Sequence, residues 1–482
     1  MNQSGQNPQK KNKRIHDVAP SEVFANFMKS GWALTPLSDL KVGPAVPYAK
    51  KRRAELSAAF KGIRLVIPSG NYKVRSNDTH YPYRPHTAFA YYTGVQGVEA
   101  TADAVLVLEP SSSGHDAILF LHPRSTRDTD AFYRDAQYGE LWVGRRFTLD
   151  EARQRWDIET RKVDDLEDFL KDVKDSAVIR GEDWLVDNTV AESDRDEELV
   201  KFVSEHRLIK DEYEKAEMQK AVLATERGFA DMVRAFPAAL ASNRGERVIE
   251  GAFANRSRIE GHGTGYESIV AAGSHACVLH WIRNDGNLKD GELILIDAGI
   301  ELDSYYTADI TRTLPVNGKF SPEQRALYVL VYEAQLAGFN AIKPGVKFSE
   351  VNAAAQKVLA HGLAKLGVLT VSAEESLKPE VGLHRRWTLH GTSHHLGIDV
   401  HDCAQARKEM YMDAELKEGM CFTVEPGLYI QPDDELFAPE FRGIGIRIED
   451  DIIVTKDGCE ILGADLPRHP DEIEQWMATL KS

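Results

Sequence analysis

Four acidic residues in the second half of the chain stand at the ends of apolar, strand-like runs. Asp297 follows ELILI, Asp309 precedes ITRTL, Glu425 follows CFTV, and Glu449 lies in RIEDD. A single buried acid is most often a cap or turn residue satisfied by backbone N–H groups. Four that converge in one buried place would repel one another, and each unpaired ion would cost several kcal/mol. Convergence of these acids would therefore require a bound cation.

Histidines are concentrated in the segment WTLHGTSHHLGIDVHD, which contains His390, His394, His395 and His401. Neutral imidazole is the commonest metal ligand and a proton carrier near pH 7. Packing of any one of these rings in the core remains an alternative for each. The segment lacks the HExxH arrangement of helical zinc peptidases.

The segment RGIGIRIEDDIIV alternates apolar and other residues with a period of two. Successive side chains of a strand point to opposite faces, so Arg447 and Glu449 are expected to face the same way, opposite to Ile446 and Ile448. A solvated face on an edge strand is the alternative interpretation.

Hard oxygen donors with one imidazole favour Mn²⁺ as the bound metal, although Zn²⁺, Co²⁺ or Fe²⁺ could also occupy such a site. Two divalent ions would cancel the charge of the four acids. Paired ions roughly 3.5–4 Å apart can clamp a water molecule and polarise a carbonyl group. These residues therefore predict a two-metal hydrolase centre built from Asp297, Asp309, Glu425 and Glu449, with one of the four histidines as a further ligand.

The chain of 482 residues is long enough for two domains. Residues 1–20 are polar and are expected to form a disordered tail. Residues 21–200 alternate helix and strand patterns and predict an α/β domain with a mixed or parallel sheet. Its helices are expected at 46–60, 148–156 and 164–174, and its strands at 64–70, 102–110 and 115–123.

Residues 201–482 predict an α+β domain, introduced by a strongly helical segment at 192–236. Two further helices are expected at 321–342 and 348–366. Strand-like apolar runs are ESIVAAG, ELILIDAG, MCFTVEPGLYI and GIGIRIEDDIIVT. The acids described above lie in or beside these runs.

A net charge of −16 argues against nucleic acid as a partner, because phosphate binding needs clustered Lys and Arg. No apolar stretch approaches the length of a membrane span, and the polar N-terminus lacks the apolar region of a secretory signal. Four scattered cysteines fit a reducing compartment. A cytoplasmic location without membrane contact is therefore expected.

The motifs DAG, DITRT, HGTSHHLG, VEPGLY and RGIGIRIED resemble those of the metallopeptidases with the pita-bread fold, which include aminopeptidase P, prolidase and methionine aminopeptidase. The resemblance covers about residues 210–465 and implies a pita-bread catalytic domain. It implies that Asp309 and Glu449 bridge two metal ions and that Asp297 binds one ion with both oxygens. His394 and Glu425 would complete the other coordination sphere.

Three histidines, His280, His390 and His401, match the histidines that hold substrate and relay protons in that family. Arg447 matches its site-organising arginine. RSNDTHYPYRPHTAFAYYTG resembles the N-terminal signature of aminopeptidase P, which implies that Asp78 can reach the active site of a neighbouring subunit in a homodimer or homotetramer. An ordinary turn aspartate is the alternative for Asp78.

One feature departs from the family pattern: eleven residues separate Asp297 from Asp309, where ten are commoner in aminopeptidase P and prolidase. We expect the extra residue in the turn around Leu302 to Tyr306. Such an insertion would leave the two ligands paired.

The resemblance implies an Xaa-Pro aminopeptidase that releases the N-terminal residue from peptides with proline at position two. Attack by a metal-bridging hydroxide would open the peptide bond, with Glu425 passing a proton to the leaving nitrogen. A prolidase restricted to Xaa-Pro dipeptides is one alternative. A non-catalytic pita-bread module that binds peptides is another, although such modules have usually lost metal ligands.

Overall fold

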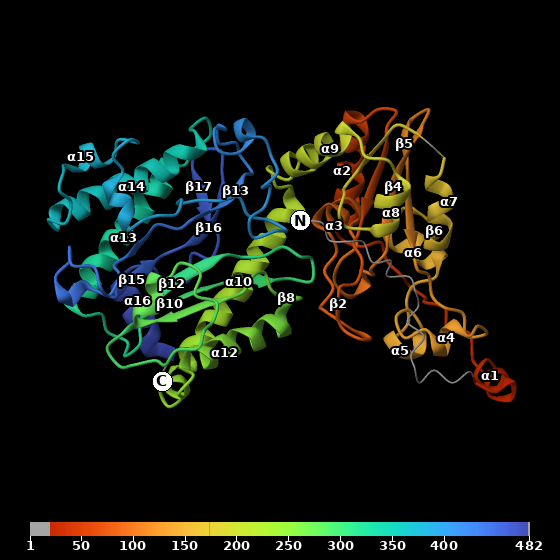
Figure 1. Cartoon of the computed structure of the whole chain (residues 1–482), viewed down its shortest axis with the longest axis horizontal. Helices are drawn as coiled ribbons and strands as arrows, with labels where there is room; N and C mark the ends of the chain where they lie inside the picture. The colour runs from red at the N-terminus through yellow and green to blue at the C-terminus, as the bar shows by residue number, and fades with distance from the viewer. Residues whose placement is uncertain (1–19, 173, 481–482) are drawn as a thin grey trace. The chain divides into compact units, whose positions relative to one another are not determined.

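The computed structural model describes residues 20–172 and 174–480, and the chain divides into two compact units between Val203 and Ser204 (Figure 1). Apart from Pro20, the predicted disordered tail lies outside the described residues. Within the described part of the chain, no helix combines the length and the apolar character that crossing a membrane requires.

The first unit contains a five-stranded mixed sheet in the order β6-β5-β4-β1-β7. The inner pairs β1–β4 and β4–β5 are antiparallel, whereas the outer pairs β5–β6 and β1–β7 are parallel. The strands are β1 (Arg64–Pro68), β4 (Val105–Ser111), β5 (Gly114–Leu121), β6 (Glu159–Lys162) and β7 (Ser176–Val178), with a separate hairpin of β2 (Val74–Ser76) and β3 (Thr79–His80). The prediction of an α/β fold with a mixed sheet is confirmed.

Along the chain, the helices of this unit precede, separate and follow the strands of the sheet. They are α1 (Glu22–Met28), α2 (Val46–Ala59), α3 (Thr87–Thr93), α4 (Ala131–Arg134), α5 (Glu140–Val143), α6 (Leu149–Trp156), α7 (Leu166–Leu170), α8 (Trp184–Thr189) and α9 (Asp194–Glu205), whose last residues belong to the second unit. The helix predicted over 164–174 is shorter than expected, because a 3-10 turn at Val163–Asp165 forms its beginning and α7 ends at Leu170.

The second unit is built from antiparallel strand pairs. Its sheets have the orders β12-β10-β9, β13-β16-β17, β14-β15 and β11-β8. The strands are β8 (Gly263–Thr264), β9 (Ile269–Ala272), β10 (Leu293–Ala298), β11 (Ile300–Glu301), β12 (Ile310–Pro315), β13 (Cys421–Val424), β14 (Gly427–Tyr429), β15 (Gly445–Arg447), β16 (Asp450–Val454) and β17 (Cys459–Ile461). The predicted strand-like runs therefore all contain strands.

Two helix pairs accompany these strands (Figure 1). The green pair α10–α12 lies beside β9 and β11, and the teal pair α13–α14 lies beside β13. The helices are α10 (Glu212–Arg234), α11 (Phe236–Leu240), α12 (Gly245–Glu260), α13 (Pro322–Ala341), α14 (Phe348–Lys365), α15 (Ala373–Ser376) and α16 (Pro470–Leu480). The sequence prediction included α13 and α14 but not α12.

The predicted helical segment at 192–236 is interrupted between α9 and α10. At the interruption, the backbone N–H of Lys210 donates to the carbonyl of Gly419 instead of to a helical partner. Asp211 then begins α10 with a capping box, since its side chain accepts from the N–H of Glu214 and the Glu214 side chain accepts from the N–H of Asp211. A tertiary hydrogen bond and a new cap therefore replace one continuous helix by two.

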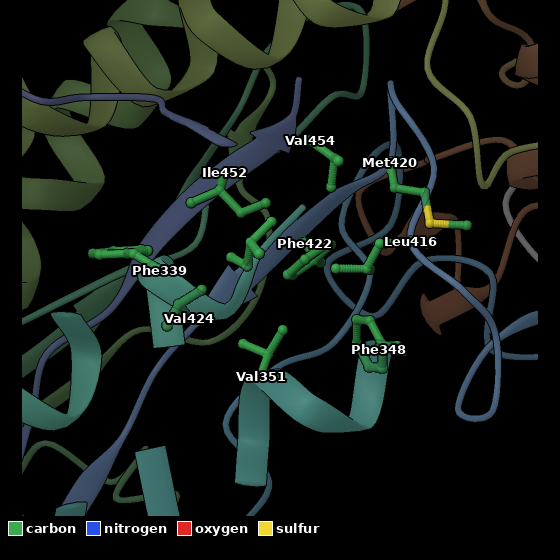
Figure 2. Packing of buried hydrophobic residues seen from close by; sticks show 10 residues of the cluster. Phe339, Phe348, Val351, Leu416, Met420, Phe422, Val424, Ile452 and Val454 are labelled. Carbon is green, nitrogen blue, oxygen red and sulfur yellow. The ribbon is translucent and has the colours of Figure 1, made fainter. Parts of the chain in front are cut away.

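A hydrophobic cluster joins α13 and α14 to β13 and β16 (Figure 2). Figure 2 shows Phe348 and Val351 of α14 facing Phe422 and Val424 of β13, with Leu416 beside them. The ring of Phe348 also stacks edge-on against Phe422, at 5.1 Å between centroids. This packing fixes β13, at whose end Glu425 lies.

Replacement of Leu416, which is 1% exposed, should test this cluster. Leu416→Ala is expected to lower the free energy of unfolding by about 2–5 kcal/mol, because it removes buried methyl groups and leaves a cavity. Leu336→Ala, on α13 and 37% exposed, is the matched control and should change it by less than about 0.5 kcal/mol. Urea denaturation followed by tryptophan fluorescence measures both; equal effects would contradict the assignment of Leu416 to the core.

Candidate metal centre

The β10–β12 hairpin brings Asp297 and Asp309 to one face. Asp297 pairs with Thr311 across the hairpin, and Thr311 and Asp309 are two residues apart, so all three side chains point the same way. The hydroxyl oxygen of Tyr266 lies 2.7 Å from Asp297 Oδ1 and 2.5 Å from Asp309 Oδ1, so it contacts both acids and donates its single proton to one of them at a time. The two acids are thus held together.

The longer connection between these two acids does not separate them. Gly299 allows the hairpin to close, because a Cβ atom there would lie 1.6 Å from the carbonyl oxygen of Ala308. The turn that follows has Tyr305 in the left-handed region, with φ of 69°, and the N–H of Tyr305 donates to the carbonyl of Leu302. Placement of the extra residue in this turn stays a prediction.

Glu449 reaches the same face from the connection between β15 and β16. Its backbone N–H donates to the carbonyl of Thr311 at 3.1 Å, and the Thr311 hydroxyl donates to Glu449 Oε2 at 2.6 Å. Arg447 Nε lies 3.9 Å from the same carboxylate, so Arg447 and Glu449 share a face as predicted.

His394 and Glu425 come from a loop and from the end of β13. The N–H of His394 donates to the hydroxyl of Thr423, and the N–H of Glu425 donates to the carbonyl of Thr392, so the loop runs along the strand. His394 Nε2 lies 3.3 Å from Asp309 Oδ2 and 3.6 Å from Glu425 Oε1. Ligand atoms of Asp309, His394 and Glu449 all lie within 4.8 Å of one another.

The five predicted ligands are therefore neighbours. Asp309, His394 and Glu449 form the closest group, Asp297 adjoins it through Tyr266, and Glu425 adjoins it through His394. The donor set of four carboxylates and one imidazole is one that binds divalent cations in proteins. The residues present thus fit a metal centre.

The pKa shifts of four of these side chains also fit a metal centre. Burial, together with the neighbouring acids, raises the pKa of Asp309 and of Glu449, and burial raises the pKa of Glu425 to about 7. Burial alone would lower the pKa of His394, but its contact with Asp309 and the charge of Glu425 raise it to about 9. In the absence of a cation the site therefore takes up protons, and a bound cation would replace them.

Arg447 and Tyr429 connect this centre to the neighbouring histidines. Arg447 Nη2 donates to Asp297 Oδ2 at 2.6 Å, and Nη1 donates to the hydroxyl of Tyr429 at 2.8 Å. The Tyr429 hydroxyl in turn lies 2.7 Å from His390 Nε2, and His390 Nδ1 lies 2.7 Å from the carbonyl of Gly391. Donation thus runs from the guanidinium through the hydroxyl to a neutral imidazole.

The three predicted substrate histidines lie around the ligands. Burial and the charge of Arg447 lower the pKa of His390 to about 4, and burial with the charge of His394 lowers the pKa of His401. The ring of His401 is 4.4 Å from that of His394. His280 is exposed, and it is close enough to His390 and His401 to contribute to their lowered pKa; its contact with the substrate stays a prediction.

Two other candidates lie elsewhere. His395 is fully buried and stacks at 5.0 Å on Phe348, so it is a core residue and not a ligand. Asp78 is exposed in the turn between β2 and β3 of the first unit, where its carboxylate accepts from the Asn77 amide. Its substrate role stays a prediction.

Sequence reasoning missed several supporting residues. The sequence around Tyr266 does not indicate a contact with the acids, because a tyrosine after a glycine-rich stretch has many structural roles. Thr311 could have been found, since it lies two residues from Asp309 and so on the same face. Asp451, whose carboxylate accepts the N–H of Asp309, was hidden by its neighbour Asp450 in the acidic run IEDD.

Comparisons with known proteins agree with this geometry. The family model for metallopeptidase family M24 matches residues 216–456, and that for the aminopeptidase P N-terminal domain matches residues 49–179. A Streptomyces coelicolor protein named Xaa-Pro aminopeptidase 1 is 51% identical over 467 residues, which cover 96% of this chain and 93% of that protein. The Escherichia coli Xaa-Pro aminopeptidase is 33% identical, covering 90% of this chain and 98% of that protein.

Solved structures resemble this fold over more than nine tenths of the chain. The aminopeptidase PepP of Pseudomonas aeruginosa superposes with a TM-score of 0.77 at 32% identity, covering 92% of this chain and 99% of that one. A low-pH form of E. coli aminopeptidase P superposes with a TM-score of 0.80 at 31% identity, covering 93% and 100%.

The chain belongs to metallopeptidase family M24, in the aminopeptidase P branch of the pita-bread enzymes. The fold prediction is confirmed, as is the prediction of a metal-dependent aminopeptidase.

Removal of the Tyr266 hydroxyl tests its contacts with the two acids. Tyr266→Phe is expected to lower metal affinity or catalytic rate by about 10–100-fold, because partners that orient metal ligands have effects of that size. Tyr328→Phe is the matched control, since the buried Tyr328 hydroxyl has no partner among the described residues. Chelator competition measures affinity, and equal affinities and rates for all three proteins would contradict the assigned role.

The raised pKa of Glu425 predicts a pH dependence for the metal-free protein. Between about 4.5 and 7 the folded protein keeps a proton on Glu425 that the unfolded chain has lost. Stability of the metal-free protein should therefore fall as pH rises through this window. Glu425→Gln removes this titration and should give a flatter profile in chemical denaturation; identical slopes for both proteins would exclude the raised pKa.

Proposed function

We propose that this protein is an Xaa-Pro aminopeptidase that uses two divalent metal ions per chain. The observation that carries the proposal is the approach of Asp309, His394 and Glu449 within 4.8 Å, with Asp297 and Glu425 adjoining. The names of relatives that align with nearly the whole chain, at 51% and 47% identity, support the substrate class.

All five predicted ligands, Asp297, Asp309, His394, Glu425 and Glu449, would hold the ions. Mn²⁺ is the metal that the four carboxylates favour, with Zn²⁺, Co²⁺ or Fe²⁺ as substitutes. When bound, paired divalent ions supply a nucleophile at neutral pH and polarise the scissile carbonyl.

The remaining chemistry falls to the protein's own side chains. Glu425, at the end of β13 and 3.6 Å from His394 Nε2, would accept a proton and return it to the leaving nitrogen. His390, kept neutral by burial and by Arg447, accepts from the Tyr429 hydroxyl, while His280 and His401 would contact the substrate. Arg447 holds Asp297 and Tyr429 in place for these contacts.

Proline at position two suits such a site. A peptide bond to proline has no N–H, so an enzyme that recognises that donor would be handicapped, whereas a pocket shaped for the ring is not. The alternatives are not favoured: the relatives are named Xaa-Pro aminopeptidases instead of dipeptidases, and all five metal-binding side chains, which binding modules usually lack, are present.

The same proposal covers organisation and assembly. We propose a tail at 1–20, an N-terminal domain at 21–200 and a catalytic domain at 201–482, which the two compact units and the family matches support. The exposed Asp78 fits a homodimer or homotetramer in which it reaches a neighbouring site. Four free cysteines fit the reducing cytoplasm.

Metal analysis and peptide hydrolysis test the proposal together. Glu449→Ala and His394→Ala should each lose bound metal and lower hydrolysis of Xaa-Pro-Yaa tripeptides by more than about 100-fold, because the metal supplies several kcal/mol of transition-state stabilisation. His361→Ala, on α14 and away from the centre, is the control and should retain both. Unchanged turnover in either ligand variant would contradict the metal-site assignment, and activity confined to Xaa-Pro dipeptides would instead indicate a prolidase.

A further inference from the structure

A buried carboxylate outside the metal centre contacts the segment that carries His280. Glu246 lies in the first turn of α12, and its side chain is fully buried. Its Oε1 accepts from the backbone N–H of Ala272 at 2.8 Å and lies 2.7 Å from His275 Nδ1. Glu246 thus contacts the beginning of this segment twice.

The second oxygen of Glu246 contacts the middle and the end of the segment. Oε2 accepts from the indole N–H of Trp281 at 2.9 Å and from the backbone N–H of Gly286 at 2.6 Å. The backbone N–H of Glu246 also donates to the carbonyl of Gly286. One residue therefore ties together four points of the segment 272–286.

The rings around this carboxylate are packed tightly. His275 stacks on Trp281 with 3.8 Å between centroids and 22° between planes. At position 286 a Cβ atom would lie 2.6 Å from His275 Cε1 and 2.7 Å from Glu246 Oε1, so only glycine fits.

Further hydrogen bonds hold the segment at Cys277 and at Asn284, on either side of His280. The buried Asn284 accepts from the N–H of Val270 and donates to the carbonyl of Ser268, and Gln431 donates to the carbonyl of Cys277. Between these anchors, Val278, His280 and Ile282 are exposed. Leu279 and Trp281, the two neighbours of His280, both pack against the cluster of Ile269, Leu295 and Tyr429, and of these two it is Trp281 whose side chain donates to Glu246.

We propose that Glu246 is a positioning residue for His280 and that it acts through the indole of Trp281. This inference rests on the proposed function, in which His280 contacts the substrate. Among the described residues Glu246 contacts none of the five metal-binding side chains, so its loss should misplace His280 without emptying the metal centre.

A double-mutant cycle on hydrolysis of the tripeptide Ala-Pro-Ala tests this coupling. Glu246→Gln should lower kcat/KM by about 10-fold while the metal content per chain stays that of the unmodified protein. In a His280→Ala background, Glu246→Gln should lower kcat/KM by less than about 2-fold, because the residue that Glu246 positions is already absent. A purely structural role would give the same fold-loss in both backgrounds.

Two variants keep the test decisive. Trp281→Phe keeps an aromatic side chain but loses the indole N–H together with the five-membered ring, so it should reproduce the non-additive loss even if Glu246→Gln folds poorly. Glu474→Gln changes a carboxylate that is 11% exposed and accepts from Lys319, Phe320 and Arg325 instead, and should leave kcat/KM unchanged. Additive losses would overturn the inference and leave the proposed function standing, whereas full activity of His280→Ala would overturn the substrate role of His280 and the inference with it.

Discussion

Repulsion among buried carboxylates is the constraint on which the rest of the catalytic unit depends. Asp297, Asp309, Glu425 and Glu449 are brought onto one buried face, and the pKa of three of them, Asp309, Glu425 and Glu449, is raised by burial and by their neighbours. A fold that brings such groups together is stable only with protons or cations bound between them. The membership of the chain in metallopeptidase family M24 identifies the cation as a metal ion.

Hydrogen-bond donors from neighbouring side chains partly offset the repulsion among these carboxylates. The Tyr266 hydroxyl contacts Asp297 and Asp309, Thr311 donates to Glu449, and Arg447 donates to Asp297. Behind the hairpin, the fully buried Arg312 pairs with Asp450 at 2.6 Å and also donates to the carbonyl of Glu449 at 2.7 Å. Buried ion pairs of this kind orient their neighbours well, and they destabilise the fold strongly when one partner is lost.

Much of this arrangement could be predicted from the sequence. Period-two alternation placed Arg447 and Glu449 on one face, the apolar runs gave the strands, and the density of histidines pointed to His390, His394 and His401. Contacts between distant segments could not be predicted, because no local pattern encodes them: Tyr266 reaches the acids from the stretch before β9, and Glu246 reaches the His280 segment from a helix that the periodicity did not reveal. His395 shows the opposite failure, since its residue type fits a ligand while its packing against Phe348 makes it a core residue.

Calorimetric titration of the chelator-treated protein with Mn²⁺, repeated in buffers of different ionisation enthalpy, tests the central claim most directly. If the buried acids form a two-metal centre, two equivalents of metal should bind per chain and protons should be released near neutral pH, because the raised pKa of Glu425 leaves protons for the metal to displace. Absence of saturable binding, or binding that is unchanged in Glu449→Ala, would contradict the account.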